Sequence, residues 1–196
     1  RRSSSRNSLV NYLQKDGLGF GSRLGAMNAN SIQSNMTERN NAAKLQSSSG
    51  LLEQQAKLLG EKVDQGSGTI TSTASSVVDK FNETMKNLRN SSGVLNDYYL
   101  QSMKEIALTN KKALSEIGIA VGADGTLVLD KDKLESVEGE KVKALLGSEG
   151  VFVKRVGIVA SRVADNAAAS MESASSRYNA SGNLTNSYLS KYNYRG

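Results

Sequence analysis

The sequence lacks histidine, cysteine and tryptophan throughout its 196 residues. Without histidine or cysteine, the common nucleophile–base pairs, thiol chemistry and most zinc sites cannot form. Acid–base catalysis relies heavily on histidine, so the composition argues against an enzyme. The absence of cysteine also excludes a scaffold held by disulfides. We therefore expect no catalytic site, no cofactor and no metal site.

Proline is absent as well, although average usage would give about ten prolines in a chain of this length. Proline breaks helices because its ring clashes with the preceding turn and it lacks an N–H donor. Its exclusion favours long, uninterrupted helices and removes slow cis–trans isomerisation from folding. Rapid refolding suits a chain that is exported unfolded. No apolar run reaches the roughly 18 residues that a membrane span requires, so we expect no span.

Positive charge gathers at both ends of the chain, whose net charge is +6. Residues 1–25 hold five basic side chains and one acidic one, and residues 151–196 hold six and two. Such ends would favour contacts with the mildly acidic middle of another subunit, or they simply keep the termini solvated. The basic residues are not interleaved with aromatics at helical spacing, so we expect no nucleic-acid binding.

Residues 1–25 are polar and contain Gly17, Gly19, Gly21 and Gly25. They predict a flexible N-terminal arm with a short helix and a glycine joint. The glycine spacing also occurs in nucleotide-binding loops, but no strand precedes it and no βαβ pattern follows. A hinge or a close-packing segment is the better interpretation.

Residues 26–65 predict an N-terminal stem helix with few large apolar residues, and residues 47–50 are a possible interruption. Asn and Ser are frequent in this segment and lower helix propensity, so it needs a partner helix. Residues 66–75 are rich in Gly, Ser and Thr and predict a connection. Ser75 or Ser76 is expected to cap the following helix.

Two helices are expected next, over residues 77–89 and 94–117. Residues at spacings of four and three run through the second of them: Leu95, Tyr99, Met103, Ile106, Asn110, Ala113 and Ile117. This spacing fits a coiled-coil-like seam in which Asn110 marks the register. It fits an ordinary amphipathic core helix equally well.

Residues 118–129 carry the strongest β signal, two short apolar runs around Asp124-Gly125. That pair suits a tight turn, so we expect a β-hairpin. Asp130 is placed to cap a helical turn that follows. Asp124, Asp130 and Asp132 do not have the spacing of a calcium loop, and turn and cap roles account for them.

A short helix is expected over residues 137–146, with Gly147 as its stop. From residue 151 a second long seam follows: Phe152, Val156, Val159, Val163, Ala167, Met171, Ala174 and Tyr178. Residues 151–196 therefore predict a C-terminal stem helix and a tail. The tail tyrosines, Tyr188, Tyr192 and Tyr194, form a contact surface or pack back on the chain's own helices.

Four segments, in this order, carry a resemblance to a known family: Val78-Asp79-Lys80-Phe81-Asn82, Leu114-Ser115-Glu116-Ile117-Gly118-Ile119, Asp124-Gly125-Thr126-Leu127-Val128-Leu129-Asp130-Lys131-Asp132-Lys133-Leu134 and Val142-Lys143-Ala144-Leu145-Leu146-Gly147. With them, residues 77–165 resemble the C-terminal region of the flagellar hook-associated protein 2 (filament cap) family. The chain would be a compact member, because residues 66–75 stand where the family carries large inserted domains.

The resemblance implies a protein exported through the flagellar channel that assembles as a ring on the filament tip and helps flagellin fold. It implies that arms at residues 26–65 and 151–190 pair beside a small head at residues 77–150.

The whole sequence thus predicts a mainly α fold, with a coiled-coil-like stem of long terminal helices and an α+β head, over residues 66–150, that contains one hairpin. Large apolar residues of both seams are expected to carry stem packing and assembly: Leu95, Tyr99, Met103, Ile106, Phe152, Val156, Val159, Val163, Met171 and Tyr178. The expected function is that of a self-assembling structural subunit of an extracellular bacterial appendage, cap-like or axial, with copies of itself and flagellin-like or other axial proteins as partners. The alternative is a free-standing secreted filament or tube built from a cap-like module.

Overall fold

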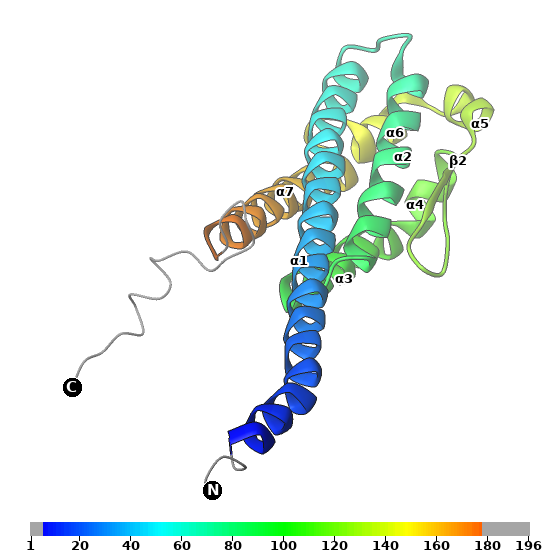
Figure 1. Ribbon diagram of the computed structural model, residues 1–196. Helices are drawn as coiled ribbons and strands as arrows, with labels where there is room; N and C mark the ends of the chain where they lie inside the picture. Colours follow the sequence, from blue (N-terminus) through cyan, green and yellow to red (C-terminus); the bar gives the residue numbers. More distant parts are fainter. Residues whose placement is uncertain (1–5, 178–196) are drawn as a thin grey trace, which may run out of the picture.

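The computed structural model describes the backbone of residues 6–177 and the side chains of residues 33–173. Its elements follow in the order α1 (Arg6–Asp64), α2 (Ile70–Arg89), α3 (Val94–Thr109), α4 (Lys111–Glu116), β1 (Ile119–Val121), β2 (Leu127–Leu129), α5 (Lys131–Ser136), α6 (Gly139–Leu146) and α7 (Val151–Arg177). The expected fold class, mainly α with long helices and one small hairpin, is confirmed (Figure 1).

Helix α1 runs without interruption for 59 residues. The expected short helix and joint before residue 26 are therefore wrong for the described backbone, and residues 47–50 do not break the helix. Ser48 and Ser49 explain the second point, because their hydroxyls donate to the carbonyl of Leu45 at 3.2 and 2.6 Å. Hydroxyls bonded back to the preceding turn are tolerated inside a helix.

Helices α1 and α7 pack against each other in opposite directions and form the stem. The end of α1 meets the start of α7, where the amide of Ser148 donates to the Asp64 carboxylate at 3.2 Å. Further along, a Cβ added to Gly157 would lie 4.0 Å from the Cβ of Ala56. The buried residues of the two facing sides are Leu45, Leu52, Ala56, Leu59 and Val63 on α1, and Phe152, Val153, Val156, Ala160, Val163 and Ala167 on α7.

Helix α2 lies beside α1 and joins the stem to the head (Figure 1). Phe81, which is fully buried, meets the buried Phe152 of α7 at a ring-centroid distance of 6.0 Å. Helix α2 begins at Ile70, so the prediction that Ser75 or Ser76 caps it is wrong. Both serines lie inside the helix, and the hydroxyl of Ser76 donates to a carbonyl one turn earlier.

The expected single helix over residues 94–117 is divided into α3 and α4 at Asn110. The Asn110 side-chain amide donates to the carbonyl of Ile106 at 2.8 Å. An asparagine amide that takes a backbone carbonyl competes with the helical hydrogen bonds. Asn110 therefore marks a break in the backbone rather than a register position in a seam.

Strands β1 and β2 form the expected antiparallel hairpin, with Ile119 opposite Leu129 and Val121 opposite Leu127. Gly125 closes its turn at a φ of 85°, in the left-handed region that favours glycine. The Asp130 carboxylate accepts from the amide of Lys133 at 3.0 Å, so the predicted cap of α5 is confirmed.

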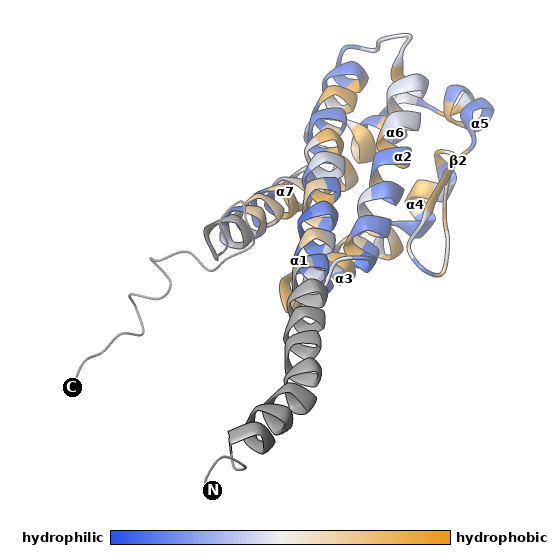
Figure 2. Cartoon of the chain, in the orientation of Figure 1, coloured by the Kyte–Doolittle hydropathy of each residue, from blue (hydrophilic) through white to orange (hydrophobic). Residues whose placement is uncertain are grey.

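The hairpin, α4 and α5 lie on the side of α2 that faces away from α1 (Figure 1). Figure 2 shows apolar and polar residues alternating in bands along α1, which is typical of a helix with one buried face. The described side chains bury one continuous apolar core that α1, α2, α3, the hairpin, α6 and α7 all share. Stem and head are therefore packed as one body over this region.

Candidate interaction surfaces

The residues predicted to carry stem packing and assembly, together with the tail tyrosines predicted to make contacts, divide into four groups. Five are buried: Met103, Ile106, Phe152, Val156 and Val163. Three are half-buried: Tyr99, Val159 and Met171. Leu95 is 55% exposed and does not pack into the chain's own core. Those outside the described side chains are Tyr178, Tyr188, Tyr192 and Tyr194.

An exposed row of side chains follows the outward face of α3. We call it the outer row, and it consists of Val94, Tyr98, Gln101, Glu105 and Leu108. In this row Val94 is 85% exposed, Tyr98 is 60% exposed and Leu108 is 37% exposed. The opposite face of α3 carries the buried Met103, Ile106 and Ala107. The sequence pattern predicted the inward row; the outer row was not predicted, although its spacing of four, three, four and three is visible in the sequence.

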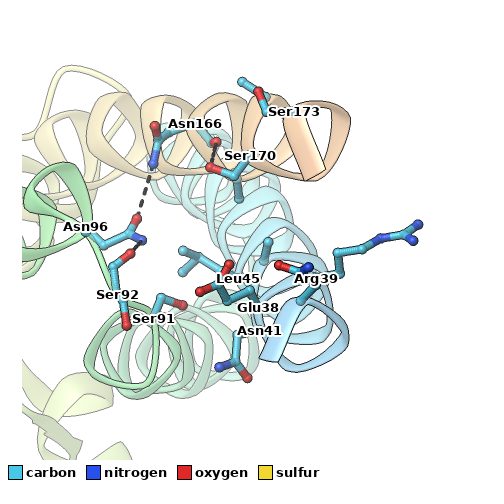
Figure 3. Close-up of a pocket in the computed structure, with 15 residues that line it drawn as sticks. Glu38, Arg39, Asn41, Leu45, Ser91, Ser92, Asn96, Asn166, Ser170 and Ser173 are labelled. Atoms are coloured by element: carbon cyan, nitrogen blue, oxygen red, sulfur yellow. Dashed lines mark hydrogen bonds between the residues drawn. The ribbon is translucent and has the colours of Figure 1, made fainter. Parts of the chain in front are cut away.

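A polar groove of about 490 Å³, the end groove, opens where α1 and α7 meet the turn between α2 and α3 (Figure 3). The amide of Asn166 donates to the Asn96 side-chain oxygen at 3.2 Å, which joins α7 to α3. Ser170 donates to the backbone carbonyl of Asn166 at 2.8 Å. Small and polar side chains dominate the lining of this groove, although the buried Leu45 also borders it.

Two further side-chain amides tie α1 to α2 and to the turn after it. Asn41 donates to the backbone carbonyl of Asn90 at 2.9 Å. Asn87 donates to the Ser48 hydroxyl at 2.9 Å and to the carbonyl of Lys44 at 3.3 Å. The many asparagines and serines that lower the helix propensity of α1 thus supply part of its tertiary contacts.

A second groove of about 530 Å³, the side groove, runs between α1 and α7 nearer the head. Its lining residues are Glu53, Ala56, Lys57 and Glu61 from α1, with Ser148, Val153, Lys154, Gly157, Ile158, Ser161 and Arg162 from the other side. Lys154 pairs with Glu149, but no ion pair between described residues spans the groove. The charges on its two walls remain open to solvent.

The hairpin is held to α2 by Asn82. Its amide donates to the carbonyl of Leu127 at 2.8 Å, and its oxygen accepts from the amide of Leu127 at 2.9 Å. Leu127 faces Val121 in a non-hydrogen-bonded pair, since the ladder bonds join Gly122 to Thr126 and Gly118 to Asp130. The Asn82 side chain therefore takes the place of a neighbouring strand for the outward backbone groups of Leu127.

Two carboxylates have a lowered pKa. Hydrogen bonds from the hydroxyl and amide of Thr126, with the charge of Arg89, hold the pKa of Asp124 below its ordinary value. Hydrogen bonds from Ser148 lower the pKa of Asp64 in the same direction. Both groups are ionised at neutral pH and serve as anchors for backbone turns.

The described residues contain no group of three acidic side chains that could hold a metal ion. Asp124 and Asp130 are occupied by turn and cap hydrogen bonds, as the sequence suggested. None of the described helices is long and apolar enough to span a membrane. The surfaces that remain for function are the outer row and the two grooves.

The chain was compared with protein-family models, with curated proteins and with solved structures, and none of them matches it.

Proposed function

We propose that this chain is a self-assembling structural subunit of an extracellular bacterial appendage, cap-like or axial, and that it acts by association and not by catalysis. The extracellular and flagellar parts of the proposal depend on the resemblance of residues 77–165 to filament caps. The assembly part depends on the outer row. Soluble monomers rarely leave aligned large apolar side chains exposed, and such patches mark interaction sites.

The outer row is complementary to itself. If two copies of α3 pack antiparallel about a two-fold axis at Gln101, Val94 of one copy faces Leu108 of the other. Tyr98 then faces Glu105, where a phenol can donate to a carboxylate, and the two Gln101 amides can pair. Every member of the row meets a partner of matching chemistry, which favours a second copy over an unrelated protein.

The apolar members would supply most of the association free energy. Fully burying a large apolar side chain contributes roughly 1.5–3 kcal/mol. A two-fold contact buries Val94, Tyr98 and Leu108 from both copies. The two-fold contact joins two chains, and a ring or filament requires a second contact on each chain as well.

Electron microscopy of the purified chain tests the proposal. It also distinguishes a cap-like subunit from a subunit of a free-standing polymer. Closed rings support a cap-like subunit. Extended filaments or tubes support the alternative, a free-standing secreted polymer. Dispersed single chains at every concentration would overturn both forms.

A further inference from the structure

The side groove has a floor of small residues and a wall on each side. Ala56 and Gly157 form its floor, and the missing side chain at Gly157 leaves the backbone of α7 uncovered. Ile158 stands on the rim and is 47% exposed. A floor of this kind lets another helix approach closely, and the exposed isoleucine gives such a helix an apolar contact.

The charges on the walls follow a regular order. Along α1 the wall residues are Glu53, Lys57 and Glu61, each one turn from the next. Along α7 the wall residues at the same spacing are Lys154, Ile158 and Arg162. Because α1 and α7 run in opposite directions with Ala56 level with Gly157, Glu53 lies within about 3 Å of the level of Arg162, and Glu61 within about 3 Å of the level of Lys154. All four of these charged side chains are exposed.

We propose that the side groove binds the side groove of a second copy of the chain, about a two-fold axis that runs along the groove. Such an axis sets α1 of one copy over α7 of the other. Glu53 then faces the partner subunit's Arg162, and Glu61 faces the partner subunit's Lys154. Each Ile158 then faces the partner subunit's Lys57, whose aliphatic stem can pack against it, so the contact has charged pairs at its two ends and an apolar contact between them.

The order of charges selects this axis over the other possible one. An axis that crosses the groove would set α1 against α1, with Glu53 facing the partner subunit's Glu61. It would also set Lys154 against the partner subunit's Arg162. Like charges would meet at all four rim positions, and like-charge juxtaposition disfavours a contact. Only the axis along the groove pairs opposite charges at all four rim positions.

The same charges argue for a second copy and against a polyanion. Acidic residues of α1 lie opposite both basic residues of the α7 wall, so the groove offers no continuous basic track for nucleic acid or anionic lipid. The inference depends on the proposed function, since it names a second surface through which that subunit associates. A chain with two separate self-contacts can extend beyond a dimer, as rings and filaments require.

Charge reversal tests the groove in a Tyr98→Asp background, where the outer row cannot contribute. Two variants of this parent reverse the charges of one wall each. The first, called the basic chain, carries Glu53→Lys and Glu61→Lys. The second, called the acidic chain, carries Lys154→Glu and Arg162→Glu. We expect the Tyr98→Asp parent to form a dimer in sedimentation velocity, and each reversed chain alone to remain monomeric. An equimolar mixture of the two should recover the dimer, because basic α1 walls face acidic α7 walls. Thermal melts of each chain by circular dichroism confirm that all of them are folded.

Cysteine cross-linking tests the axis, because the chain has no cysteine of its own. A Glu53→Cys chain should form a disulfide with an Arg162→Cys chain, and neither should cross-link with itself. Cross-linking of the Glu53→Cys chain with a Glu61→Cys chain instead would overturn the axis.

The outcomes separate the two proposals. If the wild-type chain associates but the parent is monomeric, or if the reversed chains dimerise alone, the groove inference is wrong and the proposed function stands. If the wild-type chain is monomeric at every concentration, both are wrong.

Discussion

The two ends of the stem are built differently. Near the head, Phe81, Phe152 and Leu59 are at most 1% exposed and form a tightly packed apolar centre. At the far end Leu45 of α1 and Ala167 of α7 are buried, and a hydrogen bond from Asn166 joins α7 to Asn96 of α3. Large apolar side chains dominate the first end, and small and polar ones dominate the second.

This difference separates folding from association. The outer row begins at Val94, next to Gly93 at the edge of the polar end groove. Its apolar side chains are exposed, so they contribute little to the core on which the fold depends. Substitutions near the head are therefore expected to change the free energy of unfolding, and substitutions on the outer row to change assembly.

The largest effect is expected from Phe81→Ala. Removing a fully buried aromatic ring that packs on Phe152 loses its burial and leaves a cavity. The free energy of unfolding should fall by about 3–5 kcal/mol, measured by denaturant titration. Val128→Ala, at a valine that is 65% exposed, is the control and should change it by less than about 0.5 kcal/mol. Equal effects would contradict the assignment of the core.

Asn82→Ala should come next, with a loss of about 1–3 kcal/mol. The substitution leaves the outward N–H and carbonyl of Leu127 without their side-chain partner, and Leu127 is 2% exposed. Hydrogen exchange should speed up at the amide of Leu127 before it does so in α7. An unchanged exchange rate there would show that Asn82 does not take the place of a strand.

Asn166→Ala probes the far end and should cost less, about 0.5–1.5 kcal/mol, because a single neutral hydrogen bond is lost at a partly exposed site. The same denaturant titration measures the change. A loss as large as that of Phe81→Ala would remove the contrast between the two ends.

The smallest effect concerns pH and Asp124, whose pKa is lowered in the folded chain. A carboxylate with a lowered folded-state pKa stabilises the fold at pH values above its unfolded-state pKa, near about 4. That stabilisation is lost as the pH falls through the lower folded-state value. Asp124→Asn should therefore remove a small part of the acid destabilisation below about pH 4. Melting temperatures of the two chains, compared across this range, measure the effect, and identical pH profiles would contradict it.

The sequence predicted the elements whose signals are local. The hairpin followed from Asp124-Gly125 between two apolar runs, and the cap of α5 followed from Asp130. The apolar face of the C-terminal helix followed from the spacing of Phe152, Val156 and Val163. In each case a short pattern of residues determines a short piece of structure.

Other features depend on contacts that no local pattern reveals. Ser48 and Ser49 lower helix propensity, yet they lie inside α1 because their hydroxyls bond to its own carbonyl groups. Asn110 was expected to lie in a seam and instead breaks the helix. Asn82 was noticed only as part of a resemblance, since its role depends on a hairpin 45 residues away.

Sedimentation velocity of the wild-type chain and of Tyr98→Asp, over a range of concentrations, tests the central claim most directly. Val128→Asp is the matched control, because it places the same charge at an exposed apolar residue outside the outer row. We predict that the wild-type and control chains form assemblies larger than a dimer, while Tyr98→Asp stops at the dimer with an unchanged melting temperature. Assemblies of the same size in all three chains would contradict the claim that the outer row joins the subunits.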